Sequence, residues 1–147
     1  MRLCAIVPSY RHFTALPALS EALRDRLHSV LIIDDGNEGA AQSAIAALHA
    51  PVCGVEVIRL EINSGKGAAM LAGFRAAIDR DYTHALQIDA DGQHDIADVD
   101  KFIDAAHHAQ DSLICGQALY DASVPKPHIE SAISSEQVSA HTQKWVI

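Results

Sequence analysis

Short apolar runs alternate along the chain with longer segments in which apolar residues recur every three or four positions. The runs at 3–7 and 29–33 consist almost entirely of apolar residues, and the segments at 15–28 and 96–110 have the helical spacing. A short, continuous apolar run is typical of a strand covered on both faces, whereas a three-to-four spacing predicts an amphipathic helix. Extended to the whole chain, the pattern predicts strands at 3–7, 29–33, 55–60, 84–88 and 112–115, and helices at 15–28, 39–49, 68–80 and 96–110.

This alternation predicts an α/β fold with a doubly wound, mostly parallel sheet, because short loops join each strand to the helix that follows it. The segment 55–60 is less uniformly apolar than the other strands, which favours a position at the edge of the sheet. Gly73 lies inside a predicted helix, where glycine costs about 1 kcal/mol relative to alanine. We therefore expect Gly73 to pack closely against the sheet. A chain of 147 residues is long enough for one such domain.

Charge and cysteine content narrow the function classes. Eleven Lys and Arg residues stand against nineteen Asp and Glu residues, which gives a formal net charge of -8 and argues against nucleic acid as a partner. The nine histidines show no metal-binding spacing, and the three cysteines form no CxxC pair. No apolar run approaches the roughly 18 residues of a membrane helix. The simplest expectation is a cytoplasmic protein.

Polar, glycine-containing or acidic loops follow four of the predicted strands. The carboxyl ends of parallel strands meet at one edge of a sheet, so these loops are expected to share one crevice where the strand order reverses. Each loop alone also fits a plain turn, a helix entry or a solvated surface segment. The four loops are Pro8-Ser9-Tyr10, Asp34-Asp35-Gly36, the segment 63–67 and the segment 89–95.

The two most informative loops carry opposite charges. Asp89 and Asp91 are two positions apart at the end of a strand, where clustered carboxylates repel each other unless a cation lies between them. A hard divalent cation with oxygen ligands would answer that repulsion. Lys66 stands between two glycines at a predicted helix N-terminus, a suitable place for an anion. The loop is not a Walker A motif, because Leu60 occupies the position of its first glycine and Gly67 follows the lysine.

In this order and at these separations, the four motifs resemble the family 2 glycosyltransferases of GT-A fold, closest to the dolichyl-phosphate-mannose-synthase-like branch. The resemblance implies a Rossmann-like nucleotide-sugar-binding domain. It implies a nucleoside pocket lined by Pro8, Tyr10 and Asp35. It implies further contacts with the nucleotide sugar from Asn63, Gly65, Lys66, Asp89, Ala90 and Asp91, and a divalent metal held by Asp89, Asp91 and Gln93.

The same resemblance implies the reaction. A sugar would pass from a nucleoside diphosphate to an acceptor with inversion, assisted by Mg or Mn. The candidate acceptors are a lipid phosphate, at the inner face of the membrane, and a glycan. A metal held by two carboxylates suits this chemistry because it neutralises the charge that develops on the leaving diphosphate. The general base is expected beyond the residues that match the family. Neither the nucleotide, the sugar nor the oligomeric state follows from the sequence.

The chain departs from the family in two places. Asn37-Glu38-Gly39 stands where the family has Ser or Thr followed by Asp, and the likeness ends after residue 126. We therefore expect a nucleotide-sugar-binding domain at 1–126, a poorly ordered non-family tail at 127–147 and an incomplete C-terminal half of the fold. A non-catalytic nucleotide-sugar-binding fragment is the alternative. A sugar-nucleotide pyrophosphorylase fits less well, because such enzymes expect a glycine-rich loop after the first strand and residues 8–13 contain no glycine.

Overall fold

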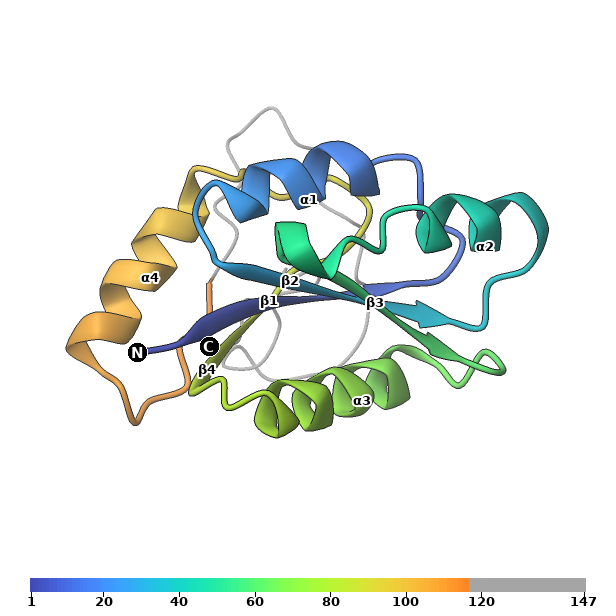
Figure 1. The fold of residues 1–147 in the computed structure, drawn as a ribbon. Coiled ribbons are helices and arrows are strands. Elements are labelled where there is room, and N and C mark those ends of the chain that lie inside the picture. Colours follow the sequence, from blue (N-terminus) through green and yellow to red (C-terminus); the bar gives the residue numbers. More distant parts are fainter. Residues whose placement is uncertain (117–147) are drawn as a thin grey trace, which may run out of the picture.

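The fold is a parallel four-stranded sheet with helices on both faces (Figure 1). The structure, a computed structural model, describes residues 1–116. All neighbouring strands in the order β3-β2-β1-β4 are parallel, which confirms the predicted α/β, doubly wound sheet. The elements are β1 (Leu3–Ser9), α1 (Leu16–Arg24), β2 (Ser29–Asp35), α2 (Gly39–Ala46), a 3-10 turn η1 (Pro51–Cys53), β3 (Val55–Leu60), α3 (Lys66–Asp79), β4 (His84–Gln87) and α4 (Asp98–His108).

Two apolar layers enclose the sheet. Successive strand residues point to opposite faces, so Ala5 and Val7 join a cluster with α1, α2 and α4, whereas Cys4 and Ile6 join a second cluster with α3. Figure 1 shows the same division, with α1 and α2 on one side of the sheet and α3 on the other. Burial raises the pKa of the Cys4 thiol to about 12, so this cysteine is a neutral core residue.

Gly73 is the point of closest approach between α3 and the sheet. A Cβ at this position would collide with the side chain of Ile6 and press on Ile33. The absence of a side chain lets α3 pack against β1 and β2, which confirms the expected reason for a glycine inside this helix. The N-terminus of α3 is thereby held close to the carboxyl ends of these strands.

The order of the strands reverses between β1 and β4. From β1 the chain proceeds through α1, β2 and α2 to the edge strand β3, and α3 then crosses the opposite face and brings the chain to β4. The predicted edge position of β3 is thus confirmed. In doubly wound sheets ligands bind beyond the carboxyl ends of the strands at such a reversal, so the loops after β1 and β4 are the first place to look for a site.

The structure corrects the sequence prediction at two strands. Residues 112–115 are not a strand: Ser112 donates its backbone N–H to Ala109 in a turn, and Leu113 is 68% exposed. Within residues 1–116 this segment pairs with no strand, and an apolar run without a ladder partner stays irregular. Conversely, β2 extends two residues beyond its apolar run and takes in Asp34 and Asp35.

Most helices are also shorter than predicted, since α1 ends at Arg24, α2 at Ala46 and α4 runs from Asp98 to His108. No helix in the part of the chain that the structure describes is both long and apolar enough to cross a bilayer. The predicted domain end at residue 126 and the predicted tail at 127–147 lie outside the described residues.

Candidate functional site

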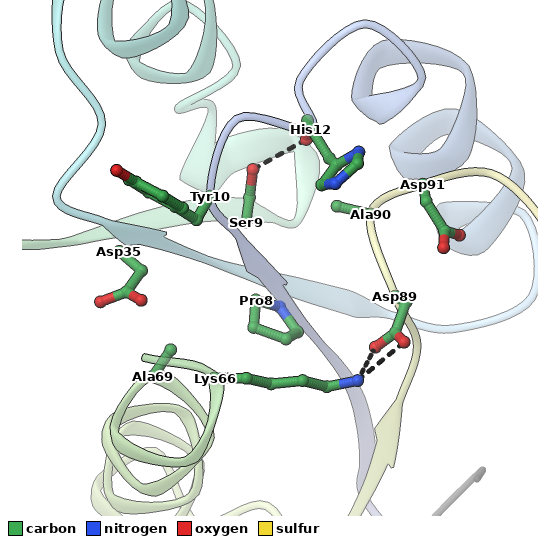
Figure 2. Close-up of a pocket in the computed structure, with 10 residues that line it drawn as sticks. All are labelled: Pro8, Ser9, Tyr10, His12, Asp35, Lys66, Ala69, Asp89, Ala90 and Asp91. Carbon is green, nitrogen blue, oxygen red and sulfur yellow. Dashed lines mark hydrogen bonds and ion pairs between the residues drawn. The ribbon is translucent and has the colours of Figure 1, made fainter. Parts of the chain in front are cut away.

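A cavity of about 240 Å³ opens at the carboxyl ends of β1, β2 and β4, beside the N-terminus of α3 (Figure 2). It lies where the strand order reverses, as the topology requires. The strands and α3 bring together side chains from four loops that are far apart in the sequence. The lining residues are Pro8, Ser9, Tyr10, His12, Asp35, Lys66, Ala69, Asp89, Ala90 and Asp91.

An ion pair crosses the cavity. The ammonium group of Lys66 lies 2.7 Å from each carboxylate oxygen of Asp89, and Figure 2 shows both contacts. The side chain of Lys66 is 56% exposed and that of Asp89 is 30% exposed. The positive charge that the clustered aspartates require is therefore supplied, in this structure, by Lys66.

Asp91 lies in the same cavity but takes no part in that ion pair. Its Oδ1 accepts a hydrogen bond of 3.0 Å from the backbone N–H of Gln93, which shapes the turn after β4. Gly92 makes this turn possible with a φ of 74°. Gln93 itself does not line the cavity.

The carboxylates of the cavity suit a hard divalent cation only if a bound ligand supplies further oxygen atoms to the cation. Within residues 1–116 no group of three His, Cys, Asp or Glu side chains is arranged to hold a metal ion. Asp89 and Asp91, on the loop after β4, do line one cavity, and Mg²⁺ is commonly held by one or two carboxylates together with substrate phosphates and water. The residues present therefore fit a cation that is shared with a phosphorylated ligand.

The carboxylate of Asp35 braces the loop that leads into α3. It is 2% exposed and accepts hydrogen bonds from the backbone N–H groups of Ser64, at 2.8 Å, and Gly65, at 2.9 Å. The side-chain amide of Asn63 adds a further bond of 3.2 Å. Asn63 and Gly65 thus hold Asp35 in place and do not themselves line the cavity. Asp35 lines the cavity and, through its bonds to the loop, also sets the position of Lys66.

Asp34, the other acid at the end of β2, faces away from the cavity into a separate network. Its Oδ2 pairs with Arg59 on β3 at 2.6 Å, and its Oδ1 accepts two bonds from Asn37. Asn37 in turn bonds to the backbone of Ser9 and Arg11. Asn37, where the sequence departs from the family pattern, therefore connects the end of β2 to the loop after β1.

Tyr10 separates this cavity from a second hollow. The neighbouring hollow has a volume of about 330 Å³, and Tyr10, Asn37 and Asn63 are among the residues that line it. The guanidinium of Arg11 lies over the Tyr10 ring, 4.9 Å from its centroid. Tyr10 is 38% exposed and presents a flat surface beside both spaces.

His94 is buried next to the acidic loop. Burial lowers the pKa of this histidine, the charges of Asp89 and Asp91 oppose the shift, and the charge of Lys66 adds to it. The imidazole is therefore neutral at physiological pH. The neutral ring of His94 therefore adds no positive charge beside the cavity.

The cavity contains most of the residues that the sequence singled out, namely Pro8, Tyr10, Asp35, Lys66, Asp89, Ala90 and Asp91. Three lining residues were not predicted: Ser9, His12 and Ala69. Ser9 lay within a recognised motif, and its hydroxyl donates to the carbonyl of His12 at 2.8 Å. His12 and Ala69 carry no signal in the sequence, because only the fold places them beside the cavity.

Comparison with known proteins identifies the family of the chain. Residues 4–132 match the family described as glycosyl transferase family 2. The chain is 30% identical over 111 residues to the undecaprenyl-phosphate mannosyltransferase of Micrococcus luteus, which covers 74% of this chain and 46% of that protein. It is also 30% identical over 116 residues to the polyprenol monophosphomannose synthase of Mycolicibacterium smegmatis. That match covers 77% of this chain and 44% of the synthase. The chain thus spans less than half the length of these two curated relatives.

Solved structures agree on the fold. The crystal structure of S. aureus TarS superposes with a TM-score of 0.52 at 22% identity and covers 73% of this chain and 20% of TarS. A crystal structure of TarS 1–349 gives the same TM-score at 21% identity and covers 73% of this chain and 33% of that chain. At this level of identity the likeness supports the architecture alone.

Proposed function

The chain belongs to glycosyl transferase family 2, and from this premise we propose that its cavity binds a nucleoside-diphosphate sugar together with a divalent metal. The full activity proposed is transfer of the sugar to an acceptor with inversion. One observation carries the proposal: Asp89, Asp91 and Lys66, which suit a metal and a diphosphate, line the same cavity as Pro8 and Tyr10, which suit a nucleoside.

The proposed roles follow from position and chemistry. Pro8 and Tyr10 offer an apolar wall and an aromatic face at the end of β1, and Asp35 lines the same cavity from the end of β2. Lys66 and the N-terminus of α3 provide positive charge for phosphate oxygens. The hollow on the other side of Tyr10 gives the nucleoside further room, next to Asn63.

Asp89 and Asp91 would hold the metal, with Gln93 as the third candidate ligand on the same loop. When bound, Mg or Mn supplies a Lewis acid that stabilises the charge of the departing diphosphate. The acidic chain needs such a cation, because its formal net charge is -8 and three carboxylates, those of Asp35, Asp89 and Asp91, line the cavity that would take the phosphates. Because His94 is neutral, Lys66 and the metal would supply the positive charge that faces the diphosphate.

A polyprenyl phosphate is the proposed acceptor, and the inner face of the cytoplasmic membrane is the proposed location. The support is the pair of relatives, whose names describe mannosyl transfer to undecaprenyl phosphate and synthesis of a polyprenol monophosphomannose. Mannose is the proposed sugar on the same ground.

Calorimetry with UDP and GDP, in Mn²⁺ and then in EDTA, tests the binding site. We expect affinity for at least one of the two nucleotides to depend on the metal. Asp91→Ala is expected to abolish that metal-dependent affinity while the chain stays folded, because Asp91 is exposed and its hydrogen bond to Gln93 is a local turn contact. Equal affinity with and without Mn²⁺ would contradict the proposal.

A turnover assay separates transfer from binding alone. GDP-mannose and UDP-glucose are offered with undecaprenyl phosphate in detergent, and the released nucleoside diphosphate is measured. Release that depends on both the acceptor and the metal supports a transferase. Metal-dependent binding without release would favour the alternative, a non-catalytic nucleotide-sugar-binding fragment.

A further inference from the structure

Lys66 occupies a position that is electrostatically unfavourable for a lysine. It is the first residue of α3, and the N-terminus of a helix carries partial positive charge that disfavours a cation. An anion nearby offsets this cost. In the structure that anion is Asp89, whose two oxygens both lie 2.7 Å from the ammonium group.

This ion pair occupies the carboxylate that the proposed metal would need. Two cations that contact the same carboxylate lie within a few ångströms of each other and repel each other. A divalent metal at Asp89 therefore displaces Lys66. Asp91 remains accessible, because it takes no part in the ion pair.

The displaced ammonium has a place to go. The Lys66 side chain is more than half exposed and ends inside the cavity, so it can change direction without disturbing the core. Both neighbouring glycines border open space, since a Cβ added at Gly65 or Gly67 would have no atom within 4 Å. A phosphate group fits beside the first turn of α3, where it would meet both the lysine and the helix N-terminus.

Resting on the function proposed above, we propose that Lys66 is an exchangeable counter-ion that couples metal binding to diphosphate binding. Without ligand, Lys66 neutralises Asp89 and competes with the metal. When a nucleoside diphosphate arrives, Lys66 turns to its phosphates and leaves Asp89 to the metal. Because binding free energies are linked reciprocally, the diphosphate strengthens metal binding by the same factor by which the metal strengthens diphosphate binding.

The consequence is that one substitution strengthens Mn²⁺ binding only when nucleotide is absent, and so weakens the coupling. Lys66→Met keeps most of the side-chain length and removes the charge. Mn²⁺ alone is expected to bind this variant about two- to fivefold more tightly than wild type, the scale of a partly exposed ion pair. In the presence of saturating UDP or GDP, whichever binds, this gain is expected to disappear, because the diphosphate already draws the wild-type lysine away from Asp89. The factor by which the nucleotide strengthens Mn²⁺ binding is therefore expected to be smaller in the variant than in wild type.

Free Mn²⁺, measured by electron paramagnetic resonance during titration of the protein with and without nucleotide, gives both affinities without an activity assay. Lys101→Met is the matched control, because Lys101 makes a similar pair of 2.6 Å with Asp98 on the exposed surface of α4 and does not line the cavity. The control should leave both affinities unchanged. Lys66→Arg, which keeps the charge, should retain most of the coupling.

The outcomes separate the two proposals. Weaker Mn²⁺ binding by Lys66→Met both with and without nucleotide would overturn the exchange and make Lys66 a supporting group only. Unchanged affinities would overturn it as well. If wild type binds no Mn²⁺ even with nucleotide present, the proposed function itself falls and the exchange falls with it.

Discussion

Two pairs of aspartates end two strands of the same sheet, and the structure treats them in opposite ways. Asp34 and Asp35 close β2 and are 1% and 2% exposed. Asp89 and Asp91 follow β4, where the first is half-buried and the second exposed. Both pairs follow an apolar strand and precede a polar loop, so the difference between them comes from their surroundings.

The pair at β2 is held by groups that cannot leave. Backbone N–H groups of Ser64 and Gly65 bond to Asp35, and Asn37 and Arg59 bond to Asp34. These donors are fixed by the fold, and buried carboxylates need them because an unpaired charge in the interior is costly. The acids at β2 therefore tie β1, β3 and the start of α3 to one another.

The pair at β4 is neutralised by a group that can leave. Lys66 is a flexible side chain at the rim of the cavity, and Asp91 accepts a turn hydrogen bond from Gln93 and takes no part in the ion pair. A carboxylate with an exchangeable partner is free to bind a metal, whereas carboxylates whose donors are fixed hold the structure in place, even where one of them, Asp35, also lines the cavity. This contrast predicts a graded series of effects on stability.

The largest effect is expected at Asp34. Asp34→Ala leaves the Arg59 guanidinium and the Asn37 amide without their acceptor, and losing one partner of a buried ion pair costs about 3 to 5 kcal/mol. Arg59 is one-third exposed and can be rehydrated, so we expect about 3 kcal/mol, measured as a lower free energy of unfolding in urea. Asp34→Asn, which keeps one acceptor, should lose less. A loss below about 0.5 kcal/mol in both variants would remove the contrast with β4.

A smaller effect is expected at Asp35. Asp35→Ala removes the acceptor of two backbone N–H groups in an exposed loop, where water replaces part of the loss, so we expect about 1 to 2 kcal/mol. Hydrogen exchange should accelerate at the amides of Ser64 and Gly65, while the amides of β1 serve as the internal control. Unchanged exchange at these two amides would show that Asp35 does not brace the loop.

The smallest effect on stability is expected at Asp91. Asp91→Ala removes one local turn contact on the surface, and such substitutions usually change the free energy of unfolding by less than about 0.5 kcal/mol. The same urea measurement applies. A loss as large as that of Asp34→Ala would place Asp91 in the structural group and weaken its assignment to ligand binding.

The sequence alone determined the architecture and the edge of the sheet that carries the site. Apolar runs and helical spacing predict the order of the elements, and the convergence of strand ends in a parallel sheet predicts that residues as distant as Tyr10 and Asp89 share a cavity. The pattern failed at 112–115, because a short apolar run becomes a strand only when a neighbour offers a ladder of hydrogen bonds.

The tertiary structure alone decided what each charged residue does. Asp34, Asp35 and Asp89 are chemically identical, and each meets partners that lie 22 or more residues away along the chain, apart from Asn37 beside Asp34. Those meetings depend on the register of β2 with β3 and on the close packing of α3 at Gly73, which brings Lys66 to the end of β4. The residues next to each aspartate in the sequence do not predict these long-range contacts. Which carboxylates stabilise the structure and which can bind a ligand is therefore decided only when the strands and helices pack together.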